Sequence, residues 1–90
     1  DYNKHIILGM MANKDHNKYM SYFKNISSLT TVDIPNQINA INGIELKNKF
    51  PNAEFRESIQ EAINKLNLEE NDIVLITGSL YLAGEVLKLN

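Results

Sequence analysis

Short apolar runs alternate with amphipathic segments along this chain, and this alternation restricts its fold more than any other feature. Strand-like runs are expected at residues 5–11, 28–35, 53–55 and 73–76. Each run is followed by a segment with apolar residues three and four positions apart, the spacing of an amphipathic helix. Strands joined by helices form a parallel sheet with right-handed crossovers. The sequence therefore predicts an α/β fold: a Rossmann-like three-layer sandwich in which helices cover both faces of a mostly parallel sheet.

Capping residues and apolar faces indicate the helices. Asp15 is placed to cap a helix whose apolar side chains are Tyr19, Met20, Tyr22, Phe23 and Ile26. Ser58 and Glu61 have the spacing of a capping box, ahead of the apolar stripe Ile59, Ala62, Ile63 and Leu66. A short helix is expected over residues 43–50, after a loop at 36–42. The last helix is expected from about Leu80, with four side chains turned inward: Leu82, Ala83, Val86 and Leu87.

Composition narrows the possible functions. Ninety residues are enough for one small domain, which we expect to span residues 1–90. The net charge of −2 and the lack of a basic block argue against a nucleic-acid partner. No apolar run is long enough for a membrane helix, so no membrane association is expected. The chain has no cysteine, which excludes disulfides and thiolate sites and fits a cytoplasmic location.

Two turns qualify as ligand sites, because ligands of parallel sheets bind at the carboxyl ends of strands. The first, "GMMANKDH", contains Lys14 and Asp15, and the second, "TGSLY", contains Gly78, Ser79 and Tyr81. Simpler roles stay open: Gly78 as a turn residue, Ser79 and Asp15 as helix caps, Lys14 as a solvated cation. The second turn matches only part of a dinucleotide fingerprint, and the GxxxxGK[ST] phosphate loop is absent from the sequence. The two histidines are too isolated to predict a metal site.

The closing segment "DIVLITGSLYLAGEVL" resembles the last strand, turn and helix of folylpolyglutamate synthases and the related dihydrofolate synthases, which end in "VTGSLYLVGEV"-like text. "ILGMMANKDHNKYM" is similar to the family's "GMxxDKDxxxxL" segment, and "ESIQEAI" to a helix start of the family. One position departs from this pattern, since Asn13 stands where the family has an aspartate. The family's "DGAHNP"-type motif is also missing. The resemblance therefore implies most of a C-terminal domain, without the family's first strand and helix.

This family belongs to the Mur ligase-like ATP-dependent amide ligases. The resemblance implies that ATP phosphorylates a carboxyl group of dihydropteroate or of a folate, and that the amino group of L-glutamate then displaces the phosphate. It also implies that an N-terminal ligase domain, outside this sequence, binds most of the ATP, Mg²⁺ and pteroate. Ser79 resembles the family serine that faces the cleft near the incoming glutamate. The expected substrate-binding residues are thus Ser79, Gly78, Tyr81, Lys14 and Asp15, with no catalytic residue in this segment.

A second hypothesis from another class is a non-catalytic α/β binding module, flavodoxin-like or receiver-like. A receiver domain needs paired acidic residues after its first strand and an aspartate at the end of a central strand. Asp33, followed by Ile34 and Pro35, matches this requirement poorly. The ligase hypothesis predicts a phosphate-binding loop a few hundred residues upstream, which the binding-module hypothesis does not.

Overall fold

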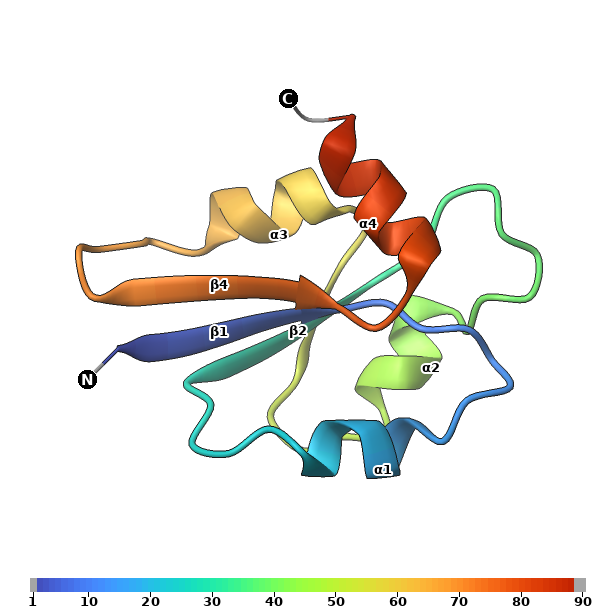
Figure 1. Cartoon of the computed structure of the whole chain (residues 1–90), viewed down its shortest axis with the longest axis horizontal. Helices are drawn as coiled ribbons and strands as arrows, with labels where there is room; N and C mark the ends of the chain where they lie inside the picture. The colour runs from blue at the N-terminus through green and yellow to red at the C-terminus, as the bar shows by residue number, and fades with distance from the viewer. Residues whose placement is uncertain (1, 89–90) are drawn as a thin grey trace.

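A computed structural model describes residues 2–88 and gives alternating strands and helices, as the sequence predicts (Figure 1). In chain order the elements are β1 (Asn3–Leu8), α1 (His16–Ser21), β2 (Ser28–Val32), α2 (Gly43–Lys47), β3 (Glu54–Arg56), α3 (Ile59–Lys65), β4 (Asp72–Thr77) and α4 (Leu80–Leu87). The four strands form one sheet in the order β3-β2-β1-β4, and every pair is parallel. The predicted α/β fold with a parallel sheet is confirmed.

Helices lie on both sides of the sheet, α1 and α2 on one face and α3 and α4 on the other (Figure 1). Alternate residues of β1 point to the two faces. Ile6 and Leu8 pack in a core cluster with Met20 of α1 and Leu46 of α2. Ile7 packs on the opposite side in a second cluster, with Ile59, Ala62 and Leu82 of α3 and α4. The continuous apolar run of β1 is thus explained by burial on both faces.

The outer strand β4 is covered on one face only. Val74 and Ile76 pack against the cluster under α3 and α4. Ile73 and Leu75 point to the other face and stay 45% and 42% exposed. The predicted sheet with helices on both faces is confirmed, and α1 and α2 leave this face of the edge strand β4 partly exposed.

Several predicted boundaries and burial assignments differ from the structure. β1 ends at Leu8 and not at residue 11, because beyond Gly9 the backbone pairs with the loop after β2, where the Ile41 amide donates to the Met10 carbonyl at 3.0 Å. Helix α1 ends at Ser21, and Tyr22, expected in its apolar face, is 70% exposed. Leu82 and Val86 of α4 pack inward as predicted, whereas Ala83 and Leu87 are exposed. Those two residues lie one position farther along the helix, about 100° around its axis, and so point away from the sheet.

Caps define the helix starts that position the site. Asp15 caps α1, accepting a hydrogen bond from the Lys18 amide at 3.0 Å. Ser58 caps α3 by accepting from the Glu61 amide at 3.1 Å, as the capping-box spacing predicts.

Among residues 2–88, no helix has the length and the apolar character needed to cross a membrane.

Candidate functional site

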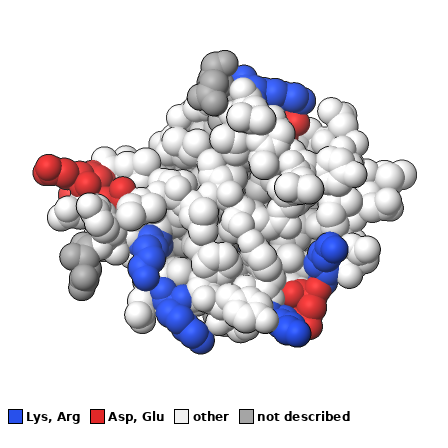
Figure 2. All heavy atoms as spheres, viewed as in Figure 1, with Lys and Arg blue, Asp and Glu red and all other residues white. Residues whose placement is uncertain are grey.

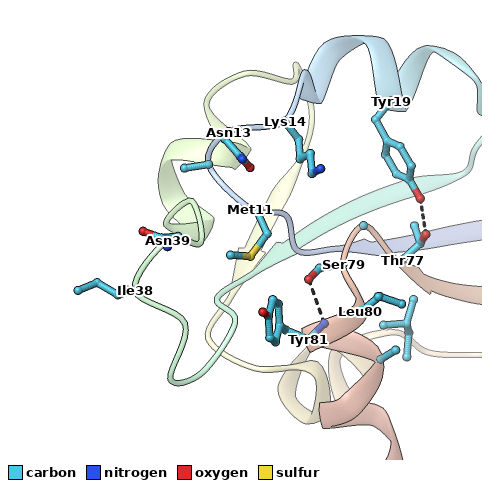
Figure 3. Close-up of a pocket in the computed structure, with 14 residues that line it drawn as sticks. Met11, Asn13, Lys14, Tyr19, Ile38, Asn39, Thr77, Ser79, Leu80 and Tyr81 are labelled. Atoms are coloured by element: carbon cyan, nitrogen blue, oxygen red, sulfur yellow. Dashed lines mark hydrogen bonds between the residues drawn. The ribbon is translucent and has the colours of Figure 1, made fainter.

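A cleft of about 1040 Å³ opens at the carboxyl edge of the sheet. Three connections line it: the loop after β1, the loop between β2 and α2, and the turn between β4 and α4. Parallel pairing brings the first and the last of these together, since Leu8 at the end of β1 lies beside Thr77 at the end of β4. Both ligand turns predicted from the sequence therefore line one cavity, as the rule for parallel sheets implies (Figure 3).

Gly78 joins β4 to the turn in a conformation that other residues rarely adopt, with φ +114°. A β-carbon at this position would clash with the carbonyl oxygen of Gly9 and would lie 2.9 Å from side-chain carbons of Leu8 and Met10. The Gly9 amide in turn donates to the Thr77 carbonyl at 3.2 Å. The glycine thus allows the β4 turn to approach the end of β1 closely, which is the structural role that the sequence left open.

Ser79 is the N-cap of α4 and also lines the cleft. Its hydroxyl oxygen accepts a hydrogen bond from the Tyr81 amide at 3.1 Å (Figure 3). The hydroxyl hydrogen is still free to donate to a ligand, because a serine hydroxyl can donate and accept together. Tyr81 itself lines the cleft and is 53% exposed. The cap role of Ser79 is therefore real and compatible with ligand binding.

Among residues 2–88, Lys14 is the only charged residue that lines the cleft. Its side chain extends from the loop after β1 into the space between Tyr19 and Ser79 (Figure 3). Within the described residues it makes no side-chain hydrogen bond or ion pair. Asn13, which replaces the aspartate of the resembling family, also lines the cleft. The described part of the chain therefore gives the cleft a positive charge and no carboxylate, an environment suited to an anionic ligand.

The predicted site residues divide between two places. Gly78, Ser79, Tyr81 and Lys14 line the cleft together. Asp15 does not; it lines a smaller adjoining cavity and uses one carboxylate oxygen to cap α1.

The sequence did not indicate two further parts of the cleft. Tyr19, expected only in the core, reaches the cleft and hydrogen-bonds Thr77 (Figure 3). Ile38 and Asn39 line the cleft from the loop after β2, where Ile38 is 98% exposed. The only sequence signal for Tyr19 was its hydroxyl group, a polar atom on a helix face that was expected to be buried. Nothing in the aperiodic loop pointed to Ile38.

The residues that the structure describes do not fit a magnesium site. Residues 2–88 contain no group of three His, Asp or Glu side chains close enough to hold a metal ion. Asp33, the residue considered for a receiver-like site, accepts a hydrogen bond from the Gly43 amide at 2.7 Å. It therefore orders the start of α2 and is not part of an acidic cluster.

A separate polar network lies at the opposite, amino edge of the sheet. His5 on β1 lies 2.7 Å from the Ser28 hydroxyl and 3.2 Å from a carboxylate oxygen of Asp72. The other Asp72 oxygen accepts from the Glu69 amide at 2.7 Å. That hydrogen bond, with further ones to Asn3 and His5, lowers the pKa of Asp72 below its ordinary value. The network links three strands and has no contact with the cleft.

Comparison with solved structures identifies two proteins of the same fold. FolC from E. coli, solved with DHPP and ADP, superimposes with a TM-score of 0.87 over 99% of this chain at 16% sequence identity. A bifunctional folylpolyglutamate synthase/dihydrofolate synthase from Yersinia pestis, solved with AMPPNP and a manganese ion, superimposes with a TM-score of 0.85 over 97% of the chain at 13% identity. The chain spans only 22% of the length of each protein. No protein-family model and no curated protein matches the sequence. The resemblance seen in the sequence is thus confirmed at the level of the fold.

Proposed function

We propose that this chain is the C-terminal part of an ATP-dependent amide ligase that adds L-glutamate to dihydropteroate or to a folate. Two independent findings support this. The motifs around Lys14 and Ser79 resemble those of folylpolyglutamate and dihydrofolate synthases, in the same order along the chain. The fold is that of two solved proteins with such names. The observation that supports the role of the site is that these motifs line one cleft, although Lys14 and Ser79 are 65 positions apart in the sequence.

In this proposal the cleft binds the incoming L-glutamate. The Ser79 hydroxyl donates to a carboxylate of the amino acid, and the Lys14 ammonium balances its charge. The amides at the start of α4 add a favourable field for the same anion. Gly78 keeps the turn close to β1, and Tyr81 borders the opening. The contribution of these residues to the reaction is to bind and orient the amino acid.

The nucleotide and magnesium are assigned to the remainder of the longer protein, because the sequence has no phosphate loop and residues 2–88 include no fitting set of metal ligands. An N-terminal ligase domain is the proposed partner at this edge of the sheet. Ile38 and Leu80, 98% and 90% exposed beside the cleft, supply apolar surface for that contact. Closure of the two domains would exclude water from the reacting groups. We place the enzyme in the cytoplasm.

The test is a heteronuclear NMR titration of the chain with L-glutamate, with L-alanine as the matched ligand that lacks the side-chain carboxylate. We expect L-glutamate to shift the amide signals of Gly78, Ser79, Tyr81 and the loop around Lys14. A folded chain whose signals do not change would contradict the placement of the glutamate site on this face. ATP-dependent glutamate ligation by residues 1–90 alone would contradict the assignment of the nucleotide to another domain.

A further inference from the structure

His16, the first residue of α1, has a buried imidazole ring and is not among the residues that line the cleft. The residue is only 3% exposed. Its Nε2 lies 2.9 Å from the carbonyl oxygen of Met11. Because a carbonyl only accepts hydrogen bonds, Nε2 carries a hydrogen and donates it. Nδ1 has no hydrogen-bond partner within residues 2–88, so a hydrogen on that atom would face no acceptor, and the ring fits the Nε2–H tautomer.

The histidine is a poor choice for stability alone. A buried polar atom without a hydrogen-bond partner destabilises the fold, and Nδ1 of His16 is such an atom. A leucine would fill a similar space and leave no nitrogen unpaired. What histidine supplies and leucine cannot is the hydrogen-bond donor to the Met11 carbonyl.

That carbonyl closes the turn that carries Lys14. It also accepts from the Lys14 amide, but the distance of 3.4 Å is longer than that of an ordinary N–H to oxygen hydrogen bond. The hydrogen bond from His16 is the shorter of the two. Beside Met11 the chain is paired with the loop after β2, since the Ala12 amide donates to the Asn39 carbonyl at 2.8 Å. The turn is thus held between that loop and the start of α1.

The Lys14 side chain does not hold the turn in place. Lys14 is exposed, and its ammonium makes no hydrogen bond or ion pair within residues 2–88. Figure 2 shows both basic and acidic side chains at the rim of the molecule on the side of α1, where water screens such charges. The direction of Lys14 into the cleft (Figure 3) therefore depends on the backbone of its turn.

We propose that His16 is a positioning residue for the cleft. Its Nε2–H holds the Met11 carbonyl, and this hydrogen bond fixes the turn that directs Lys14 toward the ligand. His16 does not touch the ligand itself. The effect on L-glutamate rests on the proposed function, whereas the order of the turn is a property of the chain without ligand.

Two NMR measurements on the ligand-free chain test this inference. The imidazole nitrogen shifts of His16 should show a protonated Nε2 and an unprotonated Nδ1. Backbone heteronuclear NOEs, which report fast motion, should fall at Asn13 and Lys14 in His16→Leu. They should stay near the wild-type values in His16→Gln, because the glutamine side-chain amide can still donate to the Met11 carbonyl. His5→Gln changes the other histidine, at the opposite edge of the sheet, and is the matched control that should leave these NOEs unchanged.

A double-mutant cycle with L-glutamate separates positioning from a general loss of stability. The Kd should rise about two- to fivefold in His16→Leu, the size of one exposed charge contact, and should recover in His16→Gln. If His16 acts through Lys14, His16→Leu should have no further effect on the Kd of a Lys14→Gln chain.

Four results would overturn the inference: an Nδ1–H tautomer of His16, unchanged NOEs in His16→Leu, a His16→Gln chain that behaves like His16→Leu, or an equal rise in Kd in the Lys14→Gln chain. The tautomer is measured without any substitution, so the inference can be contradicted even if His16→Leu does not fold. The two proposals fail separately. Silence of Ser79 and Tyr81 with L-glutamate contradicts the proposed function, whereas an ordered turn in His16→Leu contradicts the role of His16 whatever the ligand.

Discussion

The phenolic oxygen of Tyr19 lies 2.5 Å from the hydroxyl of Thr77, so that α1 is hydrogen-bonded to the last residue of β4. The ring of Tyr19 also packs edge-on against Phe23, with 5.5 Å between the centroids. Thr77 directly precedes Gly78 and Ser79. This single contact therefore fixes the helix that follows the Lys14 loop relative to the turn on the other side of the cleft.

Removal of the Tyr19 hydroxyl should weaken this connection. Tyr19→Phe loses a partly buried hydrogen bond, and we expect the free energy of unfolding to fall by about 1 kcal/mol. Urea denaturation followed by circular dichroism measures the change. Tyr22→Phe is the control, because that ring is exposed and its hydroxyl has no hydrogen-bond partner within residues 2–88. Equal stability of the two variants would mean that the Tyr19–Thr77 contact does not stabilise the fold.

Gly78 should be intolerant of any side chain. Gly78→Ala places a β-carbon against the Gly9 carbonyl at a φ of +114°, and we expect a loss of at least about 2 kcal/mol in the free energy of unfolding. Gly84 in α4 offers a matched control, since a β-carbon there meets no atom within 4 Å. Gly84→Ala should stabilise the chain by up to about 1 kcal/mol through helix propensity. Thermal melts should show a lower melting temperature for Gly78→Ala and a higher one for Gly84→Ala. A small loss of stability in Gly78→Ala would show that the turn can relax.

The sequence allowed the fold to be predicted because its signals are local. The apolar run around Ile6 and Ile7 and the caps at Asp15 and Ser58 each depend on neighbouring residues only. The site prediction needed one further rule, that carboxyl ends of parallel strands meet at one edge. That rule predicts that Lys14 and Ser79 lie at the same edge of the sheet, whatever the order of the strands.

The remaining features depend on contacts between distant residues. The Tyr19–Thr77 hydrogen bond requires β4 to lie beside β1, which the sequence does not specify. The exposure of Leu75 follows from the same strand order, because β4 is at an edge and α1 and α2 do not extend over it. Tyr22 is three positions after Tyr19, which is helical spacing, but it lies just past the end of α1. Periodicity alone therefore gave a wrong prediction for the burial of its side chain.

Asp72 should make stability depend on pH in acid. Hydrogen bonds from the Glu69 amide, and then from Asn3 and His5, lower the pKa of Asp72 in the folded state. The unfolded state therefore binds more protons in this range, and stability falls as the pH drops through the unfolded and then the folded pKa. Asp72→Asn should flatten the dependence of unfolding free energy on pH below about pH 5, where an unfolded aspartate begins to bind a proton.

Urea denaturation across that pH range tests the Asp72 prediction. Glu57→Gln, at an exposed position with no ion pair within the described residues, is the control and should keep the wild-type slope. An unchanged slope in Asp72→Asn would show that the network with His5 and Ser28 does not distinguish the folded from the unfolded state.

Two substitutions of Ser79 should separate its role as a cap from its role in binding. Ser79→Ala removes the acceptor of the Tyr81 amide and should cost about 1 kcal/mol of stability while weakening L-glutamate binding.

Ser79→Asp keeps a good N-cap and should fold as stably as the wild type. The new carboxylate enters a cleft where Lys14 is the only charged residue in the described part of the chain, so it should compete for that ammonium and raise the Kd for L-glutamate at least about tenfold. Asn67→Asp adds the same charge at an exposed position outside the cleft and should leave the Kd unchanged. Thermal melts with NMR titrations measure both quantities, and wild-type affinity in Ser79→Asp would place the glutamate site elsewhere.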